Sequence, residues 1–191
     1  MAEQNSSGLP LWSRDLIAQI DEWDREAKEL VAGLAPEQLN WQPAPGSWSI
    51  GQCLEHLCAT TDSYLPAIRA ALENGRGPAT EEIAPGGPTR WFIQKFIEPS
   101  TQAARAKAPK KIVPSGHVET TVVDRFVRGN EAVRELIRKA APYDVNRIRF
   151  KNPFVPVLRF TVGAGLLIIC RHERRHLLQA ERVKGSANFP R

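Results

Sequence analysis

Two histidines four residues apart are the side chains in this sequence whose types and spacing best suit chemistry. His172 and His176 enclose the string His-Glu-Arg-Arg-His within a segment of helical periodicity. Residues four apart share one face of an α-helix, so both imidazoles can bind one metal ion. With Glu173, the string also matches the HExxH signature of zinc proteases. A metal site within a helical fold and a peptidase are therefore the two interpretations to separate.

The residues that follow this motif argue against a peptidase. Such proteases need a third ligand downstream, either in an HxxGxxH extension or as a glutamate. The corresponding positions hold Gln179 and Arg182, and the sole acid after His176 is Glu181, on the same predicted helix. No sheet is predicted beside which an extended peptide would pair. We therefore reject the peptidase interpretation.

His56, far upstream, offers a third metal ligand. It falls two turns into another predicted helix, on a strip of small and polar residues with Cys53 and Thr60. Packed helix axes lie about 8–10 Å apart, close enough for side chains from both to meet. Three histidines would leave a fourth metal position for water or substrate, as in catalytic zinc sites. The pattern predicts a site of His56, His172 and His176, and ordinary core or surface histidines are the alternative.

Other polar residues near the motif are candidates for a role in the site. Glu173 is a candidate general base, and its alternative is solvation or pairing with Arg174. Gln179 is a candidate hydrogen-bond partner for a metal-binding histidine. Cys53 is better suited to be a small buried hydrophobe than a ligand. Asn130 either faces the site or is a core amide.

The remaining charged residues are expected to lie in solvent. His117 falls in a predicted loop. Four arginines flank the histidines on other helical faces, and we expect a solvated surface; the alternative is that one or two bind an anionic substrate or thiol carboxylate. These four are Arg171, Arg174, Arg175 and Arg182.

Four long segments with helical periodicity position these side chains. They run from about 11 to 33, 49 to 74, 119 to 141 and 160 to 184. Ser49 with Gln52 predicts a capping box at the start of the second, and Pro66 predicts a kink or a division within it. The fourth begins apolar all round, with Gly163 and Gly165, as expected of a closely packed buried helix.

The connecting segments complete the predicted architecture. A short helical piece is expected at 91–97, and Pro-rich connectors at 34–48 and 142–158. No segment shows sustained strand alternation. The sequence predicts an all-α four-helix bundle with long connecting loops and one short extra helix.

Composition places the chain among ordinary globular proteins. Its 191 residues, with 42% hydrophobic and 25% charged, predict a single domain over 1–191 with its core at about 11–184. A net charge of +5 without a block of five or six like charges does not argue for a nucleic-acid partner. No signal peptide or membrane segment is predicted. The three cysteines suggest reduced thiols and a cytoplasmic protein.

Two motifs resemble a known family. Residues 41–57 read WQPAPGSWSIGQCLEHL, which matches a W-x-P…W-S-x₆-H-L pattern, and residues 172–182 read HERRHLLQAER. The stretch 108–114, APKKIVP, also resembles the segment before the third helix in many members. With these motifs the chain resembles the DinB/YfiT-like metalloenzymes, which are unrelated to the DNA polymerase that shares the name DinB.

The resemblance implies a four-helix bundle that holds a divalent ion, most often zinc or nickel, on His56, His172 and His176. It also implies a homodimer, and in related branches S-transfer or isomerisation with low-molecular-weight thiols. We therefore expect a metal-dependent enzyme with a small-molecule substrate, either a thiol S-transferase with a thiol cosubstrate or a hydrolase. The alternative is a non-catalytic stress-response protein whose ion is structural or sensory.

Overall fold

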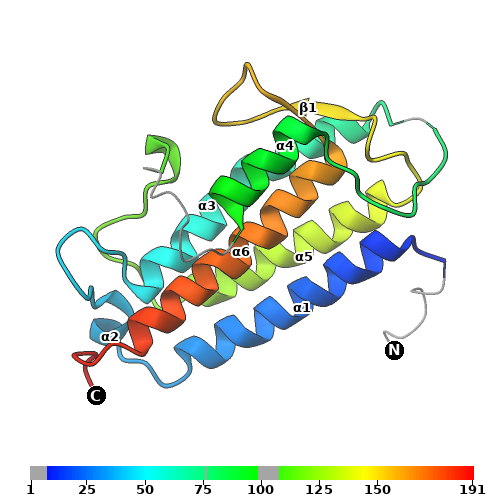
Figure 1. Ribbon diagram of the computed structural model, residues 1–191. Coiled ribbons are helices and arrows are strands. Elements are labelled where there is room, and N and C mark those ends of the chain that lie inside the picture. The colour runs from blue at the N-terminus through cyan, green and yellow to red at the C-terminus, as the bar shows by residue number, and fades with distance from the viewer. Residues whose placement is uncertain (1–7, 76, 99–107) are drawn as a thin grey trace.

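Four long helices form a bundle in the computed structural model, which describes residues 8–75, 77–98 and 108–191 (Figure 1). The predicted helical bundle is confirmed. Helices α5 and α6 each pack against both α1 and α3, so the α3–α6 and α1–α6 contacts are direct. The bounds are α1 (Leu11–Val31), α3 (Ile50–Leu72), α5 (Val122–Ala140) and α6 (Val162–Lys184).

Shorter elements lie in the connections between these helices. The predicted helical piece at 91–97 spans the end of one short helix and a π-helical turn, whereas two helical turns at 36–40 and 110–112 were not predicted. The short elements are α2 (Pro36–Asn40), α4 (Gly87–Phe92), the π-helix η1 (Ile93–Ile97), the 3₁₀ helix η2 (Lys110–Ile112), β1 (Arg149–Lys151) and β2 (Arg159–Thr161).

The expectation of a chain without strands was wrong in the last connector. Strands β1 and β2 pair antiparallel, with Phe150 opposite Phe160. Both phenylalanines are buried at the bundle end. Strands of three residues are too short to display an alternating pattern, which is why the sequence did not reveal them. The last residue of β2, Thr161, caps α6 by accepting a hydrogen bond of 3.2 Å from the Ala164 N–H.

The start of α3 agrees with the sequence, and its interior shows one of the two outcomes predicted at Pro66 to be wrong. The Ser49 hydroxyl accepts the Gln52 N–H at 3.1 Å, and the Gln52 side chain accepts the Ser49 N–H at 3.0 Å, so the capping box is confirmed. Pro66 does not divide the helix, which continues to Leu72. Leu65 and Ile68 are buried on either side of Pro66, and their packing holds both halves in the bundle.

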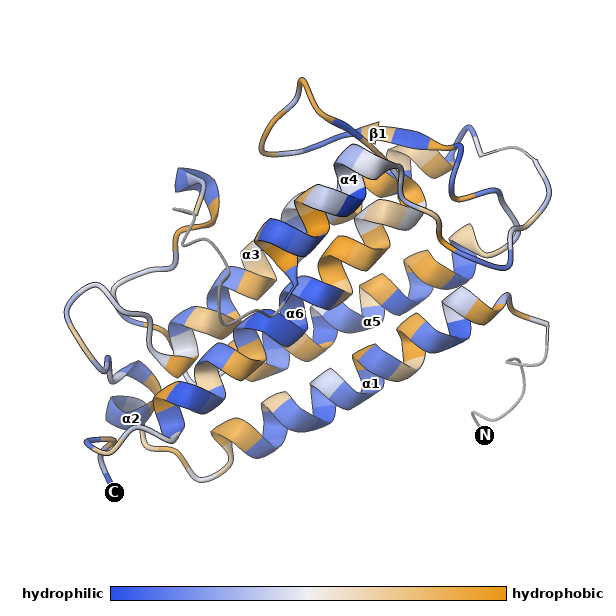
Figure 2. Cartoon of the chain, viewed as in Figure 1, coloured by the Kyte–Doolittle hydropathy of each residue, from blue (hydrophilic) through white to orange (hydrophobic). Residues whose placement is uncertain are grey.

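The beginning of α6 packs as closely as predicted. A Cβ atom added to Gly165 would lie 2.7 Å from the Phe150 ring and 3.0 Å from Ile68. At Gly163 it would lie 2.9 Å from Ile83. All three distances are shorter than van der Waals contact. Glycine therefore lets this half of α6 approach its neighbours (Figure 2, where it is largely orange).

Buried polar side chains divide the core into two apolar clusters. One cluster lies toward the β1–β2 end and the other toward α2. On each long helix buried polar residues lie at or near the place where the residues of one cluster give way to those of the other. We call this set the polar layer; its members are Asp24, His56, Thr60, Asn130, Arg134, Glu173 and His176.

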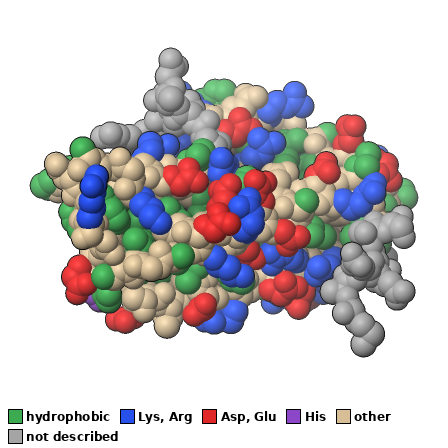
Figure 3. Space-filling model, turned by 90° about the horizontal axis from the view of Figure 1, so that it is seen from below, with side chains coloured by type: hydrophobic (Ala, Val, Ile, Leu, Met, Phe, Trp, Pro, Cys, Tyr) green, Lys and Arg blue, Asp and Glu red, His purple; other side chains and the backbone are tan. Residues whose placement is uncertain are grey.

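Charged side chains of both signs cover the outside of the bundle. On the face seen from below, Lys and Arg are interspersed with Asp and Glu (Figure 3). Some form ion pairs along a helix, such as Arg25 with Glu29 at 3.1 Å. Among the residues that the structure describes, no helix has the length and apolarity that crossing a membrane requires.

Candidate metal centre

Three histidines from two helices converge at the polar layer. The sequence separates His56 on α3 from His172 and His176 on α6, and the α3–α6 packing brings them together. One ring nitrogen from each lies within 4.8 Å of the others. The Nε2 atoms of His56 and His172 are 3.0 Å apart. Two nitrogens bound to one tetrahedral zinc ion lie roughly 3.3 Å apart, so the group could hold a metal ion.

Hydrogen bonds fix two of the imidazoles in the tautomer that a metal needs. The Nδ1 atom of His56 lies 2.7 Å from the Ile112 carbonyl oxygen, and that of His176 lies 2.9 Å from Gln179 Oε1. Both oxygens accept, so each Nδ1 carries the proton and donates it. The lone pair is then on Nε2, which in His56 lies 3.0 Å from His172 Nε2. The predicted Gln179 contact is present, whereas a backbone carbonyl such as that of Ile112 leaves no signal in a sequence.

His172 differs from the other two. Its Nδ1 is buried and has no hydrogen-bond partner among the described residues. Because His56 Nε2 bears no proton, the 3.0 Å contact requires His172 to donate from its own Nε2. A metal ion would displace that proton and replace the contact. The close approach of the His56 and His172 Nε2 atoms therefore suits a bound cation better than this hydrogen bond.

Burial keeps these imidazoles neutral. It lowers the pKa of His176 to about 3, and nearby positive charges add to the effect. It also lowers the pKa of His56, and lowers that of His172 well below its ordinary value. Neutral imidazole is the form that binds a metal. At neutral pH, protons therefore compete weakly for the three rings.

Trp48 covers one side of the triad, a contact that the sequence analysis missed. Its ring centroid lies 4.7 Å from that of His56 and 5.5 Å from that of His176. Its place immediately before the Ser49 cap was the available signal. Two surface pockets of the described residues, of about 460 and 490 Å³, are lined by other residues, at the C-terminal segment and near the N-terminal end of α1.

Cys53, one turn before His56, belongs to the apolar packing. It is 1% exposed in the cluster on the α2 side of the polar layer. Burial raises the pKa of its thiol to about 12. At neutral pH the sulfur is protonated, and a protonated thiol is a poor metal ligand and a poor nucleophile. This agrees with the preferred interpretation of Cys53 as a small buried hydrophobe.

Glu173 lies in the polar layer between α6 and its neighbours. It is 1% exposed, and both carboxyl oxygens lack a hydrogen-bond partner among the described residues. Burial and the nearby Asp24 raise its pKa well above the ordinary value, partly offset by Arg134 and Asn130. Solvation, the alternative considered from sequence, does not apply. Its role as a general base stays a prediction, and its surroundings are those of a protonated core acid.

The same part of the polar layer contains a buried ion pair that the sequence did not reveal. Arg134 on α5 binds the Asp24 carboxylate and, at 2.7 Å, that of Asp21. Asn130 donates to Asp24 at 2.8 Å, so it is a core amide rather than a residue of the histidine site. His117 is exposed, with Glu119 4.0 Å away, as expected.

A family comparison agrees with these observations. The family model of the DinB superfamily matches residues 19–180, which include all three histidines. The chain belongs to the DinB superfamily. This confirms the resemblance seen in the two motifs. Among curated proteins, no match is found for this DinB superfamily member.

Proposed function

We propose that this protein is a divalent-metal-dependent enzyme that acts on a small molecule, by transfer of a low-molecular-weight thiol or by hydrolysis. The observation that carries the proposal is the convergence of three neutral imidazoles on one point. Two of them are held by acceptors on their outer nitrogens, as in protein metal sites. Three protein ligands leave a position for substrate or water.

The ion would be zinc or nickel, because nitrogen ligands suit both. When bound, it supplies a Lewis acid that makes a thiol or water more acidic and polarises an electrophile. The histidines would hold the ion. Trp48 excludes water from one side of the site, and Ile112 and Gln179 fix the rings of His56 and His176. The homodimer implied by the resemblance stays a prediction.

Metal analysis of protein purified without a histidine tag tests the proposal. We expect close to one zinc or nickel ion per chain, and its loss in His56→Ala but not in the exposed His117→Ala. Activity is then measured with N-acetylcysteine and monochlorobimane for thiol transfer, and with p-nitrophenyl acetate for hydrolysis. Stripped protein should be inactive and should recover with added metal.

The outcomes separate the classes of function. Metal-dependent turnover in either assay supports an enzyme. If His56→Ala keeps full metal occupancy, the triad is not the site. A folded, metal-loaded protein without activity in either assay would favour the non-catalytic alternative, in which the ion is structural or sensory.

A further inference from the structure

The four arginines around the histidines on α6 fall into two pairs with different partners. Arg174 binds the Glu26 carboxylate at 2.6 Å and stacks over Trp23, with 5.0 Å to the ring centroid. Arg171 binds the Glu98 carboxylate at 3.3 Å. These two are neutralised. The four arginines expected at a solvated surface therefore differ in their partners.

The other pair, Arg175 and Arg182, forms no ion pair with any carboxylate in residues 8–75, 77–98 or 108–191. Within those residues, the single hydrogen bond of the Arg175 guanidinium goes to a neutral group, the Glu98 carbonyl oxygen, at 3.2 Å. That bond fixes the direction of the side chain. It leaves the positive charge without an anionic partner.

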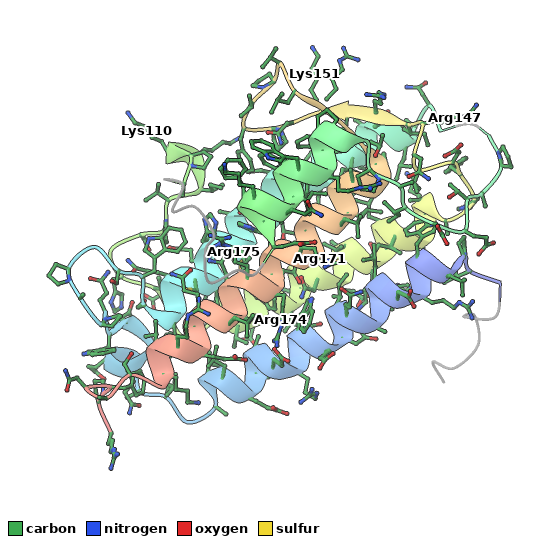
Figure 4. The ribbon with its side chains drawn as sticks, viewed as in Figure 1. Lys110, Arg147, Lys151, Arg171, Arg174 and Arg175 are labelled. Carbon is green, nitrogen blue, oxygen red and sulfur yellow. The ribbon has the colours of Figure 1, made fainter. Side chains whose placement is uncertain are left out.

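Arg175 and Arg182 occupy the same stripe of α6 as the metal-binding candidates. The stripe contains five side chains, at spacings of three, one, three and three residues: His172, Arg175, His176, Gln179 and Arg182. Steps of three residues keep His172 and Arg175 on neighbouring turns, and likewise His176, Gln179 and Arg182; the two sets lie side by side along α6. In Figure 4, Arg174 extends from α6 toward α1, whereas Arg175 lies on the other side, toward α3.

Both arginines lie close to the triad along α6. Arg175 is one turn beyond His172, and Arg182 is about two turns beyond His176. Two partly uncompensated cations beside one point favour an anion there. Guanidinium groups match carboxylates in shape and charge.

We propose that Arg175 and Arg182 form an anion-binding subsite beside the histidine triad, which selects a thiol or substrate that carries a carboxylate or a similar anionic group. This inference rests on the proposed function, because the triad would hold the ion at which such a molecule reacts. The subsite sets specificity through binding, and its arginines do not take part in bond making.

The test compares two thiols that differ in one charge. Cobalt-loaded protein is titrated with N-acetylcysteine, whose carboxylate is ionised at pH 7, and with N-acetylcysteine amide, which is neutral. The near-ultraviolet charge-transfer band of cobalt with a thiol reports binding without reliance on turnover. We expect N-acetylcysteine to bind about fivefold more tightly or better, the range of one or two well-placed charge pairs.

Variants then assign the preference to residues. Arg175→Gln/Arg182→Gln should bind both thiols equally, with cobalt content unchanged. Arg171→Gln/Arg174→Gln, which removes the same charge from the neutralised pair, should keep the preference. Circular dichroism checks the fold of each variant. The wild-type comparison of the two thiols remains decisive if a variant does not fold.

The titration results distinguish failure of the anion subsite from failure of the proposed function. Equal affinity of wild-type protein for the two thiols, with the band present for both, overturns the anion subsite and leaves the proposed function standing. Loss of the preference in the Arg171/Arg174 variant assigns it to general surface charge and also overturns the subsite. Absence of bound cobalt would overturn the proposed function, and the subsite with it.

Discussion

The outer nitrogens of the histidines determine how well the triad could hold an ion. Gln179 orients His176, and the Ile112 carbonyl orients His56, whereas His172 has no such partner in the described part of the chain. An oriented ring loses less freedom when it binds. Gln179 is therefore the side chain whose removal should weaken metal binding without removing a ligand.

We predict that Gln179→Ala lowers zinc affinity about 10- to 100-fold while His56, His172 and His176 are all retained. Competition with a chromogenic chelator measures the affinity. Gln94→Ala, at an exposed position of η1, is the control and should leave it unchanged. An affinity equal to wild type in Gln179→Ala would show that the hydrogen bond to His176 has no part in metal binding.

Glu173 gives a prediction of pH dependence. Its pKa in the folded protein lies well above the ordinary value of 4.5, chiefly through burial. Above pH 4.5 the unfolded chain releases this proton and the folded chain keeps it, so the carboxyl lowers stability as pH rises toward its folded pKa. Glu173→Gln cannot ionise, and its stability relative to wild type should rise by up to about 1.4 kcal/mol per pH unit.

Urea unfolding of metal-free protein at pH 5, 6 and 7 measures this difference. The histidines, whose pKa values are lowered on folding, cause the opposite trend in both proteins and cancel in the comparison. Glu119→Gln, an exposed substitution, should show a constant difference from wild type. A constant difference for Glu173→Gln as well would mean that Glu173 is ionised in the folded state.

At the scale of elements, α6 depends on glycine for its position. The Phe150 ring lies where a side chain at Gly165 would begin. We predict that Gly165→Ala lowers the free energy of unfolding by about 1–3 kcal/mol, because the steric cost exceeds the gain in helix propensity. Gly129→Ala on α5 is the matched control. Its Cβ would lie 3.7 Å from Thr61, an ordinary contact, so it should stabilise by about 0.5–1 kcal/mol.

Thermal unfolding with zinc chelated distinguishes the two glycine substitutions. A stabilising effect at position 165 would contradict the packing observed around α6. A destabilising effect at position 129 would indicate that α5 is more tightly packed than the structure shows.

The long helices could be predicted from sequence because their signals are local. Periodicity located all four, and Ser49 with Gln52 marked the start of α3. The β1–β2 pair could not be predicted, since three residues show no period and the pairing depends on chain reversal. Of the two outcomes predicted at Pro66, the division does not occur, because tertiary packing outweighs the local cost of a proline within α3; the kink stays a prediction.

The sequence predicted which histidine side chains form the candidate site, but not the contacts that surround them. The spacing of His172 and His176, and the position of His56, indicated which imidazoles would meet. The Ile112 carbonyl, the Trp48 stacking and the ion pair of Arg134 with Asp24 depend on which helices become neighbours. Those contacts are long range in the chain, and helix order was not available from one sequence.

At the scale of the whole molecule, an ion at the triad would join α3 to α6. A ligand that binds only the folded state at 100 times its dissociation constant adds about 2.7 kcal/mol. For a chain of this size we predict a rise in melting temperature of roughly 5–10 °C with zinc. Differential scanning calorimetry measures it. His117→Ala should show the same rise, and His56→Ala should show little; an equal rise in His56→Ala would place the stabilising ion elsewhere.

The polar layer separates two apolar clusters, and this separation would allow each cluster to unfold without the other. Each cluster draws on all four long helices, so each is a candidate cooperative unit with its own opening free energy. Amide hydrogen exchange in the metal-free protein would then reveal two classes of slow protons, one for each end of the bundle. An ion held at the boundary between them would couple the two openings, so that occupancy of the centre sets how much of the molecule behaves as a single folding unit.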